Sequence, residues 1–169
     1  MFTDCVRCFR FNIKLLRGKF ASLDAAHLDA APVDGLKAPR WVLGHLAEGH
    51  FYLVNLLGLA DQHPFPDDWM KAFAPGTPSL RPYGLDDNAD MPPADGLLDY
   101  INATEQPIVD AASSVAPGSY GDPHGIDFLY GTGIETQADL IAHLLASHYA
   151  FHLGQMSIWE RMNGQSPAF

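Results

Sequence analysis

Apolar residues recur at three- and four-residue steps along four long stretches of the chain, as they do on one side of an amphipathic helix. In the first stretch the recurring apolar positions are Phe9, Ile13, Leu16, Phe20 and Leu23. No stretch alternates apolar and polar residues in the manner of a strand. The pattern therefore predicts an all-α chain whose four helices span Thr3–Leu23, Pro39–Leu59, Ala94–Val115 and Thr136–Asn163.

Residues that favour helix ends support these boundaries. Pro39 stands where the second helix begins, and a proline in the first turn loses no hydrogen bond because its N–H would be unpaired anyway. Thr136 and Asp139 have the spacing of a capping box at the start of the fourth helix. Asn163-Gly164 is a typical helix end. Pro107 is expected to kink or break the third helix.

The connection between the second and third helices, Asp61–Pro93, contains seven prolines and cannot form a long regular helix, apart from a turn or two around Asp68–Phe73. A long irregular connection within a compact domain is usually functional or a crossover. At 169 residues the chain is long enough for one domain with a buried core. We expect residues 1–169 to form a single four-helix bundle with this Pro-rich crossover.

The charge of the chain excludes one class of partner. A formal net charge of -10 argues against nucleic acid, which needs a basic surface. The first helix is locally basic, but it lacks the apolar core and cleavage site of a targeting segment. No apolar run approaches the roughly 18 residues of a membrane span. We therefore expect a cytoplasmic protein with no membrane partner, in which Cys5 and Cys8 are free thiols.

Two histidines give the fourth helix a possible chemical role. His148 and His152 are four residues apart, so their side chains leave the helix about 40° from each other on one face. Ile141 and Leu145 share that face, which is therefore expected to point inward. Two imidazoles in a core need partners, and one metal ion would satisfy both. His45, on the aromatic and ionisable side of the second helix, is the third candidate ligand.

Three neutral imidazoles with an open fourth position match a catalytic divalent metal site. Zinc and nickel are the first candidates, with iron and manganese possible. Glu48 lies one turn after His45 and could orient a ligand, be a fourth ligand, or act as a base. Tyr52 and Gln155 are candidates for holding a water molecule or a substrate oxygen.

The remaining histidines are interpreted differently. His27, His63 and His124 fall in predicted loops or helix ends and are expected at the surface. His50 and His143 are expected on the faces opposite the candidate ligands and are excluded as ligands. A histidine pair at this spacing is, taken alone, more often structural than metal-binding. It is also not the zinc-protease motif, because Tyr149 stands where that motif carries its glutamate.

Two segments together resemble the DinB-like metalloprotein superfamily, which includes thiol-cofactor S-transferases and mycothiol-dependent maleylpyruvate isomerases. They are Trp41-Val-Leu-Gly-His45-Leu in the second helix and His148-x-x-x-His152-Leu-Gly-Gln155 in the fourth. The resemblance covers nearly the whole chain. It implies an up-up-down-down four-helix bundle with a long crossover, often a homodimer, in which the three histidines bind the metal.

Three functions are compatible with these features. The first is a metal-dependent enzyme that acts on a small molecule by thiol transfer, hydrolysis, isomerisation or detoxification chemistry. Its nucleophile would be metal-bound water or thiol, with a low-molecular-weight thiol as a possible second cofactor. The second is a non-catalytic metal-binding or stress-response protein, in which the metal is structural or senses a ligand. The third is a metal-free bundle whose histidines are hydrogen-bonded core residues.

Overall fold

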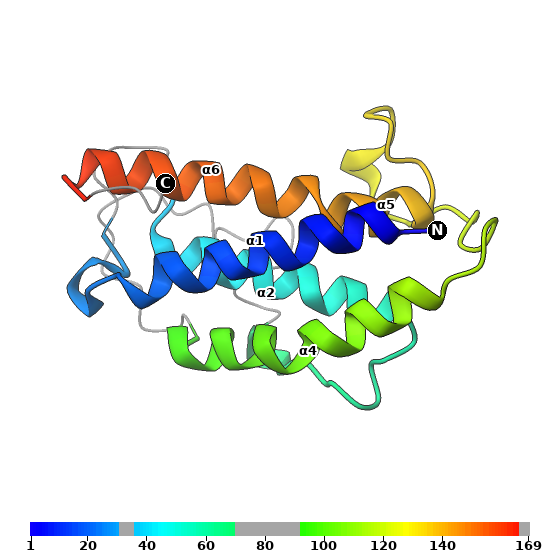
Figure 1. Ribbon diagram of the computed structural model, residues 1–169, viewed down its shortest axis with the longest axis horizontal. Helices are drawn as coiled ribbons and strands as arrows, with labels where there is room; N and C mark the ends of the chain where they lie inside the picture. The colour runs from blue at the N-terminus through cyan, green and yellow to red at the C-terminus, as the bar shows by residue number, and fades with distance from the viewer. Residues whose placement is uncertain (31–35, 70–91, 166–169) are drawn as a thin grey trace.

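Helices make up the fold of the described part of the chain, which comprises residues 1–30, 36–69 and 92–165 of a computed structural model. The α-helices are α1 (Thr3–Ala21), α2 (Pro39–Leu56), α4 (Ala94–Ser114), α5 (Gln137–Leu145) and α6 (Ser147–Met162) (Figure 1). Two short 3-10 helices, Ala25–His27 and Asp127–Leu129, lie in the connections. The prediction of an all-α fold is confirmed.

The long helices lie side by side along one axis of the molecule. α1 and α6 run in one direction and α2 and α4 in the other, so their order is up-down-down-up (Figure 1). The expected up-up-down-down order was wrong, because α1 and α2 are antiparallel. Most of the predicted Pro-rich crossover lies at residues 70–91, outside the described residues.

Local signals placed most helix ends correctly. α2 begins at Pro39, although it ends at Leu56, three residues before the predicted end. The capping box is present, since Thr136 Oγ1 accepts from the N–H of Asp139 and the Asp139 carboxylate accepts from the N–H of Thr136. α6 ends with Asn163 as its cap, and Gly164 has a φ of +67°, which suits glycine. Pro107 does not end α4, which continues to Ser114.

The predicted fourth helix is two helices, α5 and α6, separated at Ala146. Ala146 has φ −128° and ψ −77°, well outside helical values. The side-chain Nδ2 of Asn12 in α1 donates to the Ala146 carbonyl over 3.1 Å. The same carbonyl also accepts from the N–H of Ala150, over 3.2 Å, and is the first acceptor of α6. The predicted single helix over Thr136–Asn163 was therefore wrong in continuity, because the backbone leaves helical values at Ala146, where Asn12 of α1 bonds to it.

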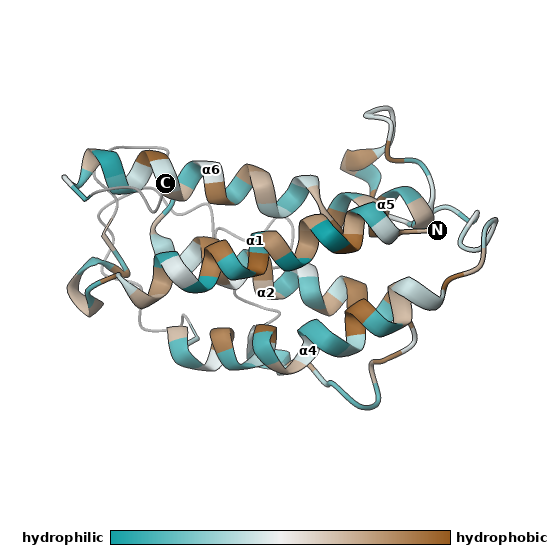
Figure 2. Ribbon diagram, in the orientation of Figure 1, coloured by the Kyte–Doolittle hydropathy of each residue, from teal (hydrophilic) through white to brown (hydrophobic). Residues whose placement is uncertain are grey.

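The core is formed by the apolar faces of all five helices, and each helix in Figure 2 alternates hydrophobic and hydrophilic turns accordingly. One ion pair lies inside it. Nζ of Lys19 in α1 lies 2.7 Å from a carboxylate oxygen of Glu160 in α6 and donates to Ser157 Oγ at 3.0 Å. The two ionic side chains are only 2% and 5% exposed. This pair fixes the far end of α6 against α1.

The described part of the long connection packs against the bundle through its aromatic residues. The Phe65 ring lies 5.4 Å from that of Phe51 in α2 and 4.9 Å from that of Tyr100 in α4. Trp69 meets Phe65 edge-on at 5.5 Å. Phe73 and Tyr83, two further aromatic residues of this connection, lie outside the described residues.

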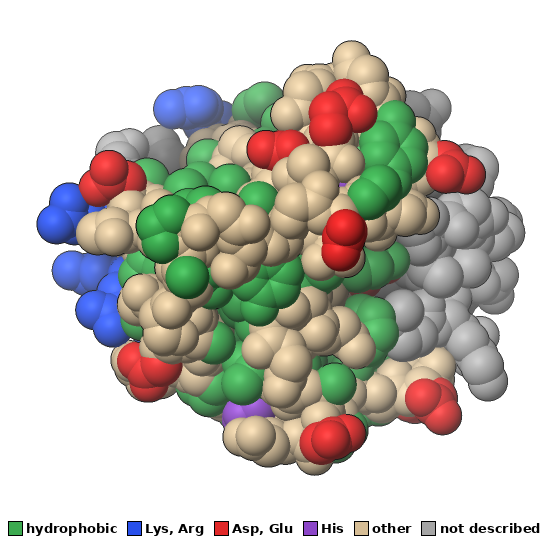
Figure 3. Space-filling model, turned by 90° about the vertical axis from the view of Figure 1, so that its right-hand side faces the viewer, with side chains coloured by type: hydrophobic (Ala, Val, Ile, Leu, Met, Phe, Trp, Pro, Cys, Tyr) green, Lys and Arg blue, Asp and Glu red, His purple; other side chains and the backbone are tan. Residues whose placement is uncertain are grey.

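Basic and acidic side chains are unevenly distributed over the surface (Figure 3), as they are along the sequence. At the end of the bundle that holds the N-terminus, basic side chains gather along one edge, whereas acidic side chains are scattered over the whole face, that edge included (Figure 3). Among the described residues, no helix is long and apolar enough to cross a membrane. Cys5 and Cys8 are both free thiols.

Candidate metal centre

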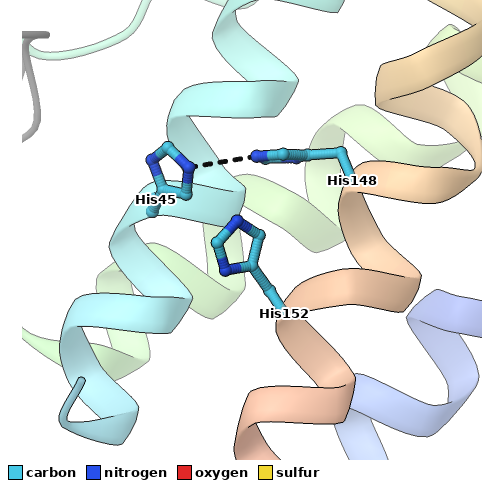
Figure 4. Close-up of side chains that lie close together, drawn as sticks. All are labelled: His45, His148 and His152. Carbon is cyan, nitrogen blue, oxygen red and sulfur yellow. Dashed lines mark hydrogen bonds between the residues drawn. The ribbon is translucent and has the colours of Figure 1, made fainter. Parts of the chain in front are cut away.

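The structure brings together the three histidines that the sequence singled out. His45 projects from the middle of α2, and His148 and His152 project toward it from successive turns of α6 (Figure 4). One nitrogen of each ring lies within 4.8 Å of the corresponding nitrogen of the other two. Among the described residues, no other group of three or more His, Cys, Asp or Glu side chains comes close enough to hold a metal ion. This arrangement could hold a metal ion.

The closest approach lies between two ring nitrogens. Nε2 of His45 and Nε2 of His148 are 3.1 Å apart. Two nitrogen ligands of a tetrahedral zinc ion would be about 3.3 Å apart, because each lies about 2.0–2.1 Å from the metal. The third ring, His152, stands edge-on to both others with ring centroids 4.7 and 4.8 Å away. The three imidazoles are donors that suit a divalent cation, and the closest pair has the spacing of two ligands on one ion.

Hydrogen bonds at Nδ1, on the side of the ring away from Nε2, fix the orientation of His45 and His152. Nδ1 of His45 lies 3.0 Å from Oε2 of Glu48, and Nδ1 of His152 lies 2.8 Å from Oε1 of Gln155. An oxygen that accepts a hydrogen bond from Nδ1 places the proton there and leaves Nε2 with a free lone pair. Both imidazoles are thus held in the tautomer that a metal ligand requires.

Burial keeps two of these imidazoles neutral. The pKa of His148 is lowered well below its ordinary value, first by desolvation and then by the neighbouring histidines. Desolvation, together with a smaller effect of His45, lowers the pKa of His152 to about 4. Metal ligands must be deprotonated, so both rings are ready to bind a cation at neutral pH.

The His148 ring differs from those of His45 and His152, because no oxygen of the described residues accepts a hydrogen bond from its Nδ1. Nδ1 of His148 is buried and makes no hydrogen bond within the described part of the chain. Instead, this edge of the ring lies against the backbone of α2 at Gly49. A buried, unpaired polar atom is costly. Because no hydrogen bond from the described residues orients the ring at Nδ1, the position of His148 depends on packing against its surroundings.

Aromatic side chains surround the exposed edge of the cluster. Trp41 stacks on His45 with ring centroids 5.0 Å apart and an interplanar angle of 19°. Phe151 meets His152 edge-on at 5.1 Å. Lys37 Nζ lies 4.8 Å from the centroid of the Trp41 ring. His45 is 30% exposed, so a small molecule can reach the cluster from this side.

Tyr52 lies near Glu48 but is less closely tied to the cluster than the other candidates. Burial raises the pKa of its phenol, and the Glu48 carboxylate raises it further. Tyr52 is therefore a neutral phenol at neutral pH. Its suggested contact with a water molecule or substrate stays a prediction.

His143 lies where the sequence did not place it, and the three histidines expected at the surface, His27, His63 and His124, are half-buried. His143 was expected on the opposite face, but its ring is 5.5 Å from that of His148 and its Nδ1 lies 2.8 Å from Ser147 Oγ. The break at Ala146 causes this, because it changes the register between α5 and α6. His124 is half-buried, and both of its ring nitrogens bond to backbone groups. Only a tertiary structure could reveal either environment.

His50 belongs to a separate buried network. Its Nδ1 lies 2.7 Å from Thr104 Oγ1, and its Nε2 lies 2.6 Å from the hydroxyl of Tyr149. Thr104 Oγ1 donates to the carbonyl of Tyr100, so it accepts from His50 Nδ1 and leaves Nε2 to accept from Tyr149. Both nitrogens are in use, which agrees with the exclusion of His50 as a ligand.

Comparison with known proteins gives a family match. A family model described as the DinB superfamily matches residues 9–156. No curated protein and no solved structure is similar enough to match the chain. The matched region includes the three histidines, all of α2 and α6 as far as Met156.

Proposed function

Because the family match covers most of its length, the chain belongs to the DinB superfamily, and we propose that it is a metal-dependent enzyme acting on a small molecule. The proposed ligands are His45, His148 and His152, and the proposed metal is zinc or nickel. The observation that carries the proposal is the convergence of these three imidazoles, one nitrogen of each within 4.8 Å of the others.

The donor set favours a catalytic over a purely structural metal. Structural zinc sites are usually closed by four protein ligands, whereas catalytic sites have three and leave one position for water or substrate. When bound, a divalent metal would act as a Lewis acid and lower the pKa of a water or thiol that binds it. Thiol transfer, hydrolysis or detoxification is the chemistry we propose, with a low-molecular-weight thiol as a possible second cofactor.

The chain's own residues would position the ligands and limit access. Glu48 contacts Nδ1 of His45, on the side of the ring away from Nε2, which favours an orienting role over a role as fourth ligand or base. Gln155 would orient His152 in the same way. Trp41 and Phe151 provide apolar surface beside the ligands, against which a small substrate could lie. The homodimer, the cytoplasmic location and the single domain over residues 1–169 stay predictions.

Elemental analysis of the untagged protein tests the site directly. We expect near-stoichiometric metal in the wild type and none in His148→Ala, because two imidazoles hold a divalent cation much more weakly than three. His143→Ala is the matched control, since it removes a neighbouring histidine that is not a proposed ligand. No metal in the wild type after incubation with zinc or nickel would support the metal-free bundle instead.

Activity assays distinguish a metal-dependent enzyme from a non-catalytic metal-binding protein. Thiol-transfer and ester-hydrolysis screens should detect turnover in the metal-loaded wild type and none in His152→Ala. Turnover that persists in the metal-free variant would contradict the proposed role of the metal. Metal-dependent melting without turnover of any thiol or ester would favour the non-catalytic metal-binding or stress-response protein.

The hydrogen bond from His152 to Gln155 should contribute to metal affinity. Gln155→Leu removes the acceptor for Nδ1–H, so the ring loses its fixed orientation and tautomer. We expect zinc affinity to fall about 10- to 100-fold, as measured by competition with a chromophoric chelator. Gln155→Glu keeps an acceptor oxygen at this position and should retain wild-type affinity or exceed it. Equal affinity of Gln155→Leu and wild type would show that this bond has no part in metal binding.

A further inference from the structure

Gly49 lies where α2 comes closest to the His148 ring. A Cβ atom at this position would be 3.2 Å from both Cε1 and Nδ1 of His148, and 3.7 Å from Leu144 Cδ2. The first two contacts are tighter than nine in ten Cβ contacts in real proteins. Any side chain at position 49 would therefore press on the imidazole of a proposed ligand.

The backbone itself does not require glycine here. Gly49 lies in the interior of α2 and is not among the glycines with positive φ. Glycine is about 1 kcal/mol less favourable than alanine inside a helix. The glycine thus weakens α2 without any conformational need for it. What it provides is space next to His148.

The His148 ring has little room to move away. It is buried, and on its other sides it meets the rings of His45, His152 and His143 at centroid distances of 4.8, 4.8 and 5.5 Å. A push from position 49 would therefore displace Nε2, the atom that faces His45. The other two proposed ligands are each oriented by an oxygen on Nδ1, but His148 has no such partner among the described residues. Its position depends on the shape of the surface against which it packs.

We propose that Gly49 is a positioning residue of the metal centre, whose missing side chain lets the His148 imidazole lie against α2 with Nε2 directed at the metal position. This inference rests on the proposed function, since it assigns Gly49 a role in the same site. It identifies a residue that contacts a ligand and does not itself bind metal.

Gly49→Ala tests the proposal because its effects on the helix and on the site should have opposite signs. In the metal-free protein the urea midpoint should be unchanged or higher, because alanine favours the helix. Zinc affinity should fall at least about 10-fold, the scale typical of residues that orient a ligand. The visible absorption spectrum of the cobalt(II)-loaded protein should also change, because the position of one ligand changes.

Two glycines provide controls. At Gly18 in α1 and Gly154 in α6, a Cβ atom would have no neighbouring atom within 4 Å, and Gly154 lies close in sequence to His152. Gly18→Ala and Gly154→Ala should raise the urea midpoint and keep zinc affinity within about twofold of wild type.

Each other outcome overturns the inference in a recognisable way. Wild-type zinc affinity and an unchanged cobalt spectrum in Gly49→Ala would show that the ring accommodates the methyl group. A lower urea midpoint in the metal-free variant, or failure to fold, would show that the glycine serves the packing of the bundle. If the wild type itself binds neither zinc nor cobalt, the proposed function fails first and the role of Gly49 falls with it.

Discussion

Lys19→Met should lower the free energy of unfolding by about 3–5 kcal/mol, because it leaves the Glu160 carboxylate in the core without its counter-charge. The two side chains are almost fully buried, and their charged atoms are 2.7 Å apart. A carboxylate in this position would either remain charged at a high cost or take up a proton. Urea unfolding at pH 7 measures the difference in stability.

Two further variants make this result specific. Lys19→Met combined with Glu160→Leu removes both charges and should recover most of the lost stability, since an apolar pair of similar volume often equals a buried ion pair. Lys14→Met, at an exposed position of α1, should change stability by no more than about 0.5 kcal/mol. A loss of less than about 1 kcal/mol in Lys19→Met would show that the pair is not isolated from solvent.

Acid should destabilise the metal-free protein, with His50 as a major cause. Complete burial lowers the pKa of His50 to about 3, with a smaller lowering from the charge of Arg17. The unfolded chain takes up a proton near pH 6.5, whereas the folded chain does so only near pH 3, so stability is full above about pH 6.5 and is lost as the pH falls. Between pH 7 and pH 4.5 the contribution of His50 should be about 3 kcal/mol, at roughly 1.4 kcal/mol per pH unit.

Comparison of the wild type with His50→Gln isolates this contribution. Glutamine offers a donor and an acceptor to Thr104 and Tyr149 but does not titrate. Urea unfolding at pH 7 and pH 4.5, in the presence of chelator, should show a loss about 3 kcal/mol smaller in the variant. All other residues are the same in the two proteins, so their contributions cancel in the comparison. Equal losses in the two proteins would mean that His50 is protonated in the folded state.

The features that could be predicted from sequence depend on short-range chemistry. Pro39 at the start of α2, the Thr136–Asp139 capping box and the Asn163-Gly164 helix end all act within a few residues of the boundary that they define. The pair His148 and His152 was placed on an inward face because helical periodicity relates residues four apart. His45 could be added because the same reasoning applies to α2.

The features that were missed depend on contacts between distant segments. No glycine or proline near Ala146 signals the break between α5 and α6, and the carbonyl at the break bonds to Asn12, 134 residues away. A continuous helix would have kept His143 away from His148, which explains why its position was predicted wrongly. The close approach of Gly49 to His148 also depends on how α2 and α6 pack, since helical periodicity predicts which face a residue occupies but not the distance to its neighbour.

α1 contributes none of the proposed ligands, yet it determines how α6 presents two of them. Asn12 and Lys19, two turns apart on α1, bond to Ala146 just before α6 and to Glu160 near its end. Two attachment points on a rigid rod define both its rotation about its own axis and its position along that axis. The angular setting of His148 and His152 is thus constrained by a neighbouring helix that carries none of the ligands. Two of the three proposed ligands are therefore oriented by the docking of α1 on α6, before any cation arrives.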